Sequence, residues 1–361
     1  MVETSDGISG LGEATGGLST MPNKEAVEEI KHLAIGKNPL EISNIVDELY
    51  KALFLKMTPA VAAIEIACWD ILGKHLKVPI YQLLGGKVRD KVRVYANGWY
   101  SGERSPENFG EKAKSLADKG YTALKFDPFG SEYLRLDKES EIFIKKIVRS
   151  VRDAVGPNVE LMIEGHKRFN TVEAIKIANW LNEFEVTWFE DPIDNDDIDS
   201  LIHVSNNSPV RIIAGEGFDD HKDFTRFVSS NATDIVNPEV MRIGGISGAV
   251  KVAGICSSFD AELAFHNAES PLKTMTNLQL CGAINNIYIQ ECFDEFNEDW
   301  IEELFPNYEK VKDGYLSIPD RPGLGISINE NVAKDHPYNK SNFLRMFKPG
   351  WENRKGAKDS E

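Results

Sequence analysis

The sequence has little of what membrane proteins, secreted proteins and zinc-binding modules require. Its longest largely apolar stretches, such as residues 60–72, are interrupted by Glu65 and Asp70 and are shorter than the about 20 residues of a membrane-spanning helix. The first residues lack the basic and apolar regions of a secretory signal. The four cysteines are scattered without a C-x-x-C pair, so we expect free thiols instead of disulfides or a zinc site. These absences predict a cytoplasmic protein that does not contact a membrane.

Positive charge is also scarce. The 41 Lys and Arg residues are outnumbered by 57 Asp and Glu residues, the formal net charge is −16 at pH 7, and no basic run offsets it. Duplex nucleic acids and anionic membranes are bound through clustered basic side chains, so neither is an expected partner.

Glycine-rich motifs for nucleotides are absent or incomplete. Thr15 stands where the last glycine of a G-x-G-x-x-G motif beginning at Gly10 would belong, so a dinucleotide site is not supported. The pair Gly244-Gly245 could bind a phosphate through backbone N–H groups, although such pairs are more often simple turns.

The first part of the chain has the pattern of an α+β domain. Residues 2–13 alternate apolar and polar side chains around Asp6-Gly7, which predicts a β-hairpin. Because Val2 already belongs to this hairpin, we expect a neighbouring first strand to be missing. Apolar periodicity then predicts three helices, and we place the domain at residues 1–87. The expected helices cover residues 24–35, 41–55 and 60–76.

Short β-branched runs alternate with amphipathic helices after Gly85-Gly86, as in repeated βα units. Eight such strands would close a parallel barrel at residues 88–305, whereas an open doubly wound sheet is the competing architecture. The predicted strands lie near residues 92–95, 123–126, 160–163, 187–190, 211–214, 235–238, 262–265 and 286–290.

Charged and histidine side chains stand at the carboxyl ends of these strands, where parallel barrels carry their active sites. They are Lys125, Asp127, Glu164, His166, Glu190, Glu216, Glu239, His266 and Glu291.

Three of the carboxylates suggest a metal site. Glu164, Glu190 and Glu216 follow one another at intervals of 26 residues, a plausible length for one βα unit. Neighbouring strands lie about 4.8 Å apart, so these groups cannot all stay ionised cheaply without a cation between them. An oxygen-only ligand set favours Mg²⁺. The alternative is that all three are solvated loop residues.

The histidines suggest acid–base chemistry. His266 follows the strand after Glu239, and a carboxylate behind an imidazole supports its use as a base. A lone histidine such as His266 would more often be a structural core or rim residue, but its pairing with Glu239 favours the base. His166 could act as an acid opposite it. Lys125 and Asp127 point to the barrel interior by strand alternation, and Lys125 could hold a substrate carboxylate. A purely structural Lys125–Asp127 pair is the alternative.

These residues and their surroundings resemble the enolase superfamily, mandelate racemase subgroup, and within it the archaeal gluconate/galactonate dehydratases. The segments that carry the resemblance are Ala60 to Asp70, Leu83 to Lys87, Tyr95 to Tyr100, Lys125 to Gly130, Glu164 to His166, Phe189 to Pro192, Gly215-Glu216 and Ala264 to Ala268.

The resemblance implies a (β/α)7β TIM-like barrel beneath an α+β capping domain, to which the C-terminal segment 306–361 returns. It implies one Mg²⁺ per subunit on Glu164, Glu190 and Glu216, and a homo-oligomeric assembly. The substrate would be a sugar acid, D-gluconate or D-galactonate, dehydrated to a 2-keto-3-deoxy acid. In this scheme His266, backed by Glu239, takes the C2 proton, and His166 protonates the departing 3-hydroxyl. Lys125 would assist, and the substrate would contact Glu291, Asp127, Trp99 and Tyr100.

Some residues depart from the family pattern and keep alternatives open. Glu239 stands where Asp is usual, and Gly217 where many relatives have Arg. Asp127 replaces a second lysine of the racemases, which disfavours a two-base racemase. An epimerase or racemase, a cycloisomerase and a non-catalytic barrel remain as alternatives. The choice of sugar acid would depend on residues 16–23, Trp99 and Tyr100.

Overall fold

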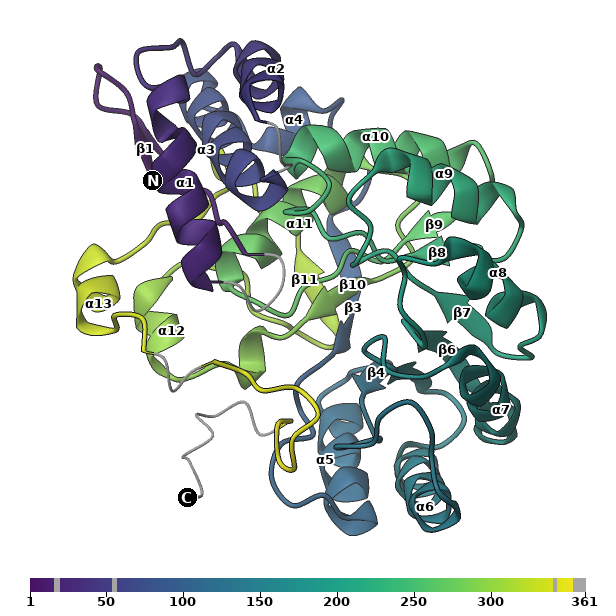
Figure 1. Cartoon of the computed structure of the whole chain (residues 1–361). Coiled ribbons are helices and arrows are strands. Elements are labelled where there is room, and N and C mark those ends of the chain that lie inside the picture. The colour runs from purple at the N-terminus through teal and green to yellow at the C-terminus, as the bar shows by residue number, and fades with distance from the viewer. Residues whose placement is uncertain (16–19, 54–56, 340–342, 353–361) are drawn as a thin grey trace.

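The N-terminal part forms a small hairpin packed on helices. The computed structural model describes residues 1–15, 20–53, 57–339 and 343–352. Gly7, at φ 86°, makes the tight turn of the predicted hairpin, and the three predicted helices are present with ends shifted by a few residues. The elements, which Figure 1 shows in purple and blue, are β1 (Val2–Glu3), β2 (Ser9–Gly10), α1 (Thr20–Ala34), α2 (Ile42–Ala52), α3 (Thr58–Leu76) and α4 (Ile80–Leu83).

A closed barrel of parallel strands follows (Figure 1). Its strands are β3 (Lys91–Ala96), β4 (Ala123–Phe126), β5 (Glu160–Glu164), β6 (Val186–Glu190), β7 (Arg211–Ile213), β8 (Ile235–Val236), β9 (Glu262–Leu263) and β10 (Gln290–Cys292). The helices between them are α5 (Pro106–Asp118), α6 (Lys138–Val155), α7 (Thr171–Leu181), the 3-10 turn η1 (Asn182–Phe184), α8 (Ile198–Asn206), α9 (His221–Ser229), α10 (Gly245–Ser257) and α11 (Pro271–Ala283).

Strand pairing decides between the barrel and the open sheet. The last strand β10 pairs in parallel with the first strand β3, which closes the ring. The backbone N–H of Asn237 donates to Ala214 O, which connects the ends of β7 and β8. Leu263 of β9 forms a parallel bridge with Ile287, which precedes β10. The last strand lies later than the predicted 286–290. The β-branched residues that suggested a strand precede Gln290 and Glu291, which pair with β3. Glu291 faces the barrel interior, where it contacts Lys125, whereas Gln290 points outward to Cys281 of α11.

The barrel interior is filled below the rim by a ring of side chains, one from each strand or the residue beside it. They are Tyr95, Ala123, Met162, Trp188, Ile213, Ile235, Ala264 and Ile289. Phe126 packs outside, against the helices, whereas its neighbour Lys125 is buried inside among carboxylates. Alternation along the strand therefore places charged groups above this apolar floor.

Glu65 of α3 joins the N-terminal elements to the barrel. Its buried carboxylate accepts hydrogen bonds from the backbone N–H groups of Ile246 (2.9 Å) and Ser247 (2.8 Å) at the start of α10. Gly245 has φ 77°, and a Cβ there would collide with the Glu65 carboxylate. The glycine pair therefore lets Glu65 reach this helix N-terminus, and the alternative of a phosphate site is not supported.

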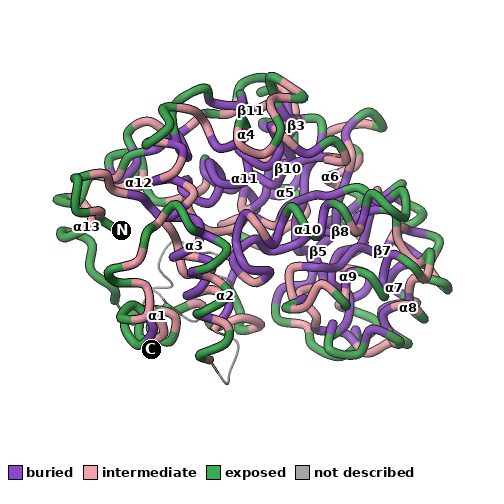
Figure 2. Tube along the Cα trace, turned by 90° about the horizontal axis from the view of Figure 1, so that it is seen from above, coloured by how far each residue is buried: buried purple, intermediate pink, exposed green. Residues whose placement is uncertain are grey.

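The C-terminal part returns to both domains. Its elements are the 3-10 turn η2 (Asp294–Phe296), α12 (Trp300–Leu304), β11 (Tyr315–Ser317) and α13 (Glu330–Asp335), and β11 pairs antiparallel with the barrel strand β3. Asp70 of α3 accepts from Leu324 N (2.8 Å) in this part and from Leu11 N (2.9 Å) after β2. One buried carboxylate thus connects both ends of the chain to α3. Most residues of this helix are themselves buried (Figure 2).

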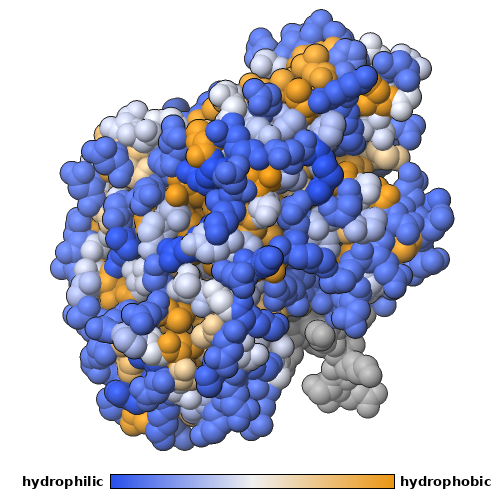
Figure 3. All heavy atoms as spheres, turned by 180° about the vertical axis from the view of Figure 1, so that it is seen from behind, coloured by the Kyte–Doolittle hydropathy of each residue, from blue (hydrophilic) through white to orange (hydrophobic). Residues whose placement is uncertain are grey.

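The surface is mostly hydrophilic from behind, with apolar side chains gathered at the upper right, over the N-terminal elements (Figure 3). A cavity of about 1010 Å³ lies there, lined among others by Met1, Ile35 and Leu40, and by none of the predicted site residues. The four cysteines are free and buried, as expected. Within the described ranges, no helix is long and apolar enough to cross a bilayer.

Candidate active site

Two histidines face each other across the carboxyl end of the barrel. His166 follows β5, the third barrel strand, and His266 follows β9, the seventh. In a closed ring of eight strands these positions are opposite. His166 and Lys167 adopt positive φ angles of 46° and 60°, so the chain turns sharply after Glu164. The space between the two imidazoles is the candidate site.

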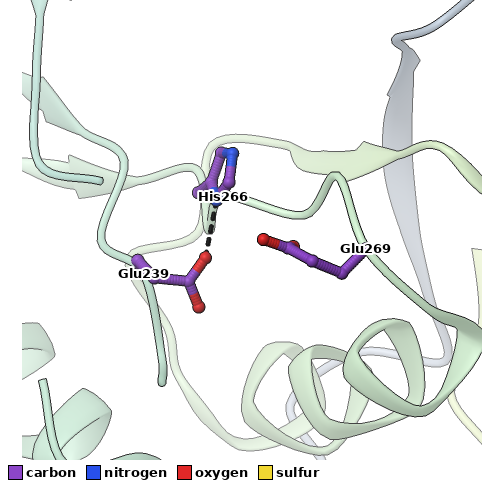
Figure 4. A group of neighbouring side chains, drawn as sticks. All are labelled: Glu239, His266 and Glu269. Carbon is purple, nitrogen blue, oxygen red and sulfur yellow. Dashed lines mark hydrogen bonds and ion pairs between the residues drawn. The ribbon is translucent and has the colours of Figure 1, made fainter. Parts of the chain in front are cut away.

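His266 is held between two carboxylates. Its Nδ1 lies 2.6 Å from Glu239 Oε2, the contact drawn in Figure 4, and its Nε2 lies 3.1 Å from Glu216 Oε2. Burial opposes the charged imidazolium, but Glu216 and the hydrogen bond to Glu239 outweigh it and raise the pKa of His266 to about 9. In this arrangement both ring nitrogens carry protons, so His266 becomes a base only when the pull of Glu216 is reduced.

Lys273, on α11, lies behind this pair and was not anticipated from the sequence. Its side chain is fully buried, and its Nζ contacts both Glu239 Oε2 and Glu269 Oε2. Burial alone would raise the pKa of Glu239, but Lys273 and His266 lower it, so Glu239 stays ionised. In the sequence, nothing marks a lysine within a largely apolar helix as a site residue. Only folding brings Lys273 to Glu239.

Among the residues that the structure describes, Glu239, His266 and Glu269 form a group that could hold a metal ion (Figure 4). Each offers one ligand atom, and these atoms all lie within 4.8 Å of one another. The predicted triad of Glu164, Glu190 and Glu216 does not meet that distance. Because the Lys273 ammonium already lies between Glu239 and Glu269, a metal there would have to displace a buried cation.

His166 has a matching environment on the opposite side. Its Nδ1 lies 2.7 Å from Asp127 Oδ2, and the buried guanidinium of Arg168 contacts the same oxygen. Asp127 Oδ1 accepts from Phe129 N at 2.9 Å. Protein donors use both oxygens of Asp127, and Oδ2 orients His166, so its predicted contact to a substrate stays a prediction. The sequence did not predict Arg168 as a site residue, because only the sharp turn after β5 brings its guanidinium to Asp127.

Lys125 occupies the centre of the site. Its Nζ lies 2.6 Å from Glu190, 3.0 Å from Glu291 and 3.1 Å from Glu164. Burial works against the ammonium, but Glu190 and the other carboxylates hold the pKa of Lys125 well above its usual range. Glu291 also accepts from Asn97 Nδ2 at 2.7 Å and from Asn267 N at 2.6 Å. Its predicted contact to a substrate therefore stays a prediction.

Carboxylates at this rim outnumber the cations beside them, which fits a metal ion. Glu164 and Glu190 pair directly across β5 and β6, and burial together with Glu164 raises the pKa of Glu190 well above its usual range. Asp191 Oδ2 is buried with no hydrogen-bond partner, and burial raises the pKa of Asp191 to about 8. A hard divalent cation would satisfy this oxygen-rich surplus.

Lys167 fills the place beside Gly217. Its Nζ lies 3.8 Å from Glu216 and 3.9 Å from Asp191, and a Cβ added at Gly217 would collide with it. Lys167 therefore brings a cation from the turn after β5 to this side of the site, and Gly217 leaves the space for it.

Trp99 and Tyr100 do not line the site, which corrects that prediction. Both are 3% exposed and pack on Phe109, outside the barrel. Trp99 Nε1 donates to the backbone oxygen of Lys125 at 2.8 Å, so its effect on the site is indirect. Of the predicted specificity segment 16–23, residues 16–19 lie outside the described residues.

Comparison with known proteins agrees with this architecture. Residues 108–332 match the family described as enolase C-terminal domain-like, and residues 1–85 match the mandelate racemase / muconate lactonizing enzyme N-terminal domain. The D-gluconate/D-galactonate dehydratase of Picrophilus torridus is 36% identical, with 96% of this chain and 90% of that protein covered. The D-gluconate dehydratase of Thermoproteus tenax is 34% identical, with 97% and 71% covered.

Solved structures show the same fold. A mandelate racemase/muconate lactonizing enzyme from Jannaschia sp. CCS1 has a TM-score of 0.86 at 28% identity, covering 93% of this chain and 91% of that one. One from Sulfitobacter sp. has a TM-score of 0.85 at 30% identity, covering 93% and 89%. The chain therefore belongs to the enolase superfamily, with both domains of its mandelate racemase and muconate lactonizing enzyme group.

Proposed function

We propose that this protein is a Mg²⁺-dependent sugar-acid dehydratase acting on an aldonic acid such as D-gluconate or D-galactonate. The observation that carries the proposal is the pair of opposed histidines, each held by a carboxylate that is itself paired with a buried cation. Relatives named D-gluconate, D-gluconate/D-galactonate and D-xylonate dehydratase, at 33–36% identity, support the substrate class.

The reaction needs a base and an acid on opposite sides of the substrate. His266 Nε2 takes the C2 proton, and the electron pair of that C–H bond forms a C2–C3 double bond. The C3–O bond breaks with its electron pair on oxygen, His166 Nε2 supplies a proton, and water leaves. The resulting enol tautomerises to the 2-keto-3-deoxy acid. Glu239 and Asp127 hold the two rings by Nδ1, which directs both Nε2 atoms to the substrate.

The proposed metal ligands are Glu164, Glu190 and Glu216. When bound, Mg²⁺ supplies Lewis-acid stabilisation of the charge that develops on the substrate carboxylate as the C2 proton leaves. Glu216, when it holds the cation, would attract His266 less strongly, and this would favour the neutral imidazole that a base requires. Lys125, released from part of its carboxylate surroundings, can pair with the substrate carboxylate.

The assembly and location belong to the same proposal. We infer a symmetric homo-oligomer located in the cytoplasm, with a small sugar acid as the functional partner.

The proposal is tested with a panel of D-gluconate, D-galactonate and D-xylonate in the presence of Mg²⁺. A colour assay for 2-keto-3-deoxy acids should be positive for at least one substrate, and His266→Asn should lower kcat by about 100- to 10,000-fold. His203→Asn, on the exposed side of α8, is the matched control and should keep full activity.

The same incubations in D₂O separate dehydration from the alternatives. Deuterium at C2 of recovered acid without water loss would support an epimerase, and full activity in His266→Asn would overturn the assignment of the base.

A further inference from the structure

The C-terminal segment supplies a wall beside His166. Trp351 is only 3% exposed, and its ring centroid lies 5.1 Å from that of His166 at an interplanar angle of 89°. Its Nε1 donates to the backbone oxygen of Gly130 at 2.9 Å. In Figure 1 the yellow segment lies beside the part of the barrel that carries β4 and α5. A residue far from the barrel in the chain is thus built into the candidate site.

The same segment covers the group that holds His166. The Arg168 guanidinium lies 4.5 Å from the Phe347 ring and 5.7 Å from the Trp351 ring. Arg168 Nη1 donates to Gly130 O at 2.8 Å, the oxygen that also accepts from Trp351. Trp351, Arg168 and Asp127 therefore form one connected support around the imidazole, and cation–π contacts with two aromatic rings replace water on Arg168.

We propose that Trp351 is a positioning residue for His166, which fixes the imidazole over the leaving hydroxyl and closes its outer side against water. This inference depends on the proposed dehydration. The Nδ1 contact to Asp127 fixes one point of the His166 ring, and the indole limits rotation about that point. The His166 side chain retains 15% exposure, which leaves one open side for a substrate.

The wall has a specific chemical consequence. Once His266 has removed the C2 proton, the anion either loses its 3-hydroxyl with a proton from His166 or takes a proton back at C2. A displaced His166 slows the first route and leaves the second intact. Loss of Trp351 should therefore uncouple C2 exchange from dehydration, whereas general loss of structure lowers both together.

Three variants test this inference: Trp351→Ala removes the wall, Trp351→Phe keeps an aromatic ring without the indole N–H, and Phe343→Ala is the control. Phe343 is 53% exposed in the same segment. In Trp351→Ala, kcat for dehydration should fall on the order of 10- to 100-fold, with C2 exchange in D₂O nearly retained. Trp351→Phe should recover much of the dehydration, and Phe343→Ala should match the unmodified protein.

A second measurement needs no substrate. The Cε1–H resonance of His166, assigned by its loss in His166→Asn, should carry a ring-current shift that moves in Trp351→Ala and not in Phe343→Ala. An unmoved resonance, or an unchanged ratio of exchange to dehydration, would overturn the role of Trp351. If the unmodified protein dehydrates none of the aldonates but the resonance shifts as expected, the contact between Trp351 and His166 stands, and both the proposed function and the positioning role of Trp351 in it fail.

Discussion

At the scale of single residues, the two histidines are held in the same way by different means. Asp127 and Glu239 each accept from an imidazole Nδ1, and each carboxylate contacts a buried cation, Arg168 or Lys273. Burial alone would raise the pKa of Asp127 and of Glu239, but the cations and histidines lower both. Both carboxylates therefore stay ionised at neutral pH and hold their rings by Nδ1.

His266 should titrate near pH 9 in the metal-free protein, because Glu216 and Glu239 favour its charged form. Mg²⁺ at Glu216 opposes the imidazolium, so saturating Mg²⁺ should lower the His266 pKa. Histidine NMR titrations with and without Mg²⁺ measure this shift. An identical titration in both states would contradict a metal ligand at Glu216.

Glu190→Gln should weaken Mg²⁺ binding by about 100-fold or more, because it removes a charged oxygen from the proposed ligand set. Isothermal calorimetry provides the affinity. Glu262→Gln, at the exposed amino end of β9, is the control and should bind as the unmodified protein does. Equal affinities in both variants would refute the triad.

At the scale of elements, α3 connects parts of the chain that are far apart in sequence. Glu65 reaches the start of α10, and Asp70 reaches backbone N–H groups after β2 and in the C-terminal part. Gly323 has φ 68°, and a Cβ there would collide with Asp70. These contacts hold the hairpin, the barrel and the returning segment in one arrangement above the strand ends.

Asp70→Ala should lower the free energy of unfolding by about 3 kcal/mol, because it leaves the buried N–H groups of Leu11 and Leu324 unpaired. Urea denaturation measures the loss. Asp47→Ala removes an exposed carboxylate from α2, where Asp47 is 56% exposed, and should change stability by less than about 1 kcal/mol. Similar stabilities for the two variants would contradict the role of Asp70.

At the scale of the whole molecule, the acidic residues behind the net charge of −16 differ in their burial. Most acidic groups are solvated, but those at the barrel rim are buried near one another, where like charges are costly. A protein that binds a divalent cation there gains stability when the cation is present.

Mg²⁺ should therefore raise the melting temperature. At 100 times its dissociation constant, a ligand that binds only the folded state contributes about 2.7 kcal/mol, which corresponds to a few degrees. Differential scanning fluorimetry with Mg²⁺, against NaCl at equal ionic strength, measures the effect. The rise should disappear in Glu190→Gln; a rise of the same size in that variant would place the bound cation elsewhere.

Local sequence pattern was sufficient for the repeated βα units and for the ring of groups at the strand ends, whereas the pairing of β10 with β3 decided for the closed barrel over the open sheet. Strand alternation and repeated βα units are local patterns, and they place Lys125, Glu164, Glu190 and His266 at strand ends without knowledge of distant contacts. Trp99 and Tyr100 were misplaced, because an aromatic pair after a strand can turn inward or outward and only helix packing decides.

The tertiary structure alone decided which partners these groups have. Lys273, Arg168 and Trp351 come from a helix, a turn and the C-terminal segment, and none has a sequence spacing that marks it as part of the site. Their roles depend on burial and on distances below 6 Å between parts of the chain that only folding brings together. Local sequence pattern determines on which element and at which strand end a side chain lies. Its charge state and its chemical role depend on desolvation and charge pairing, which are properties of the packed molecule.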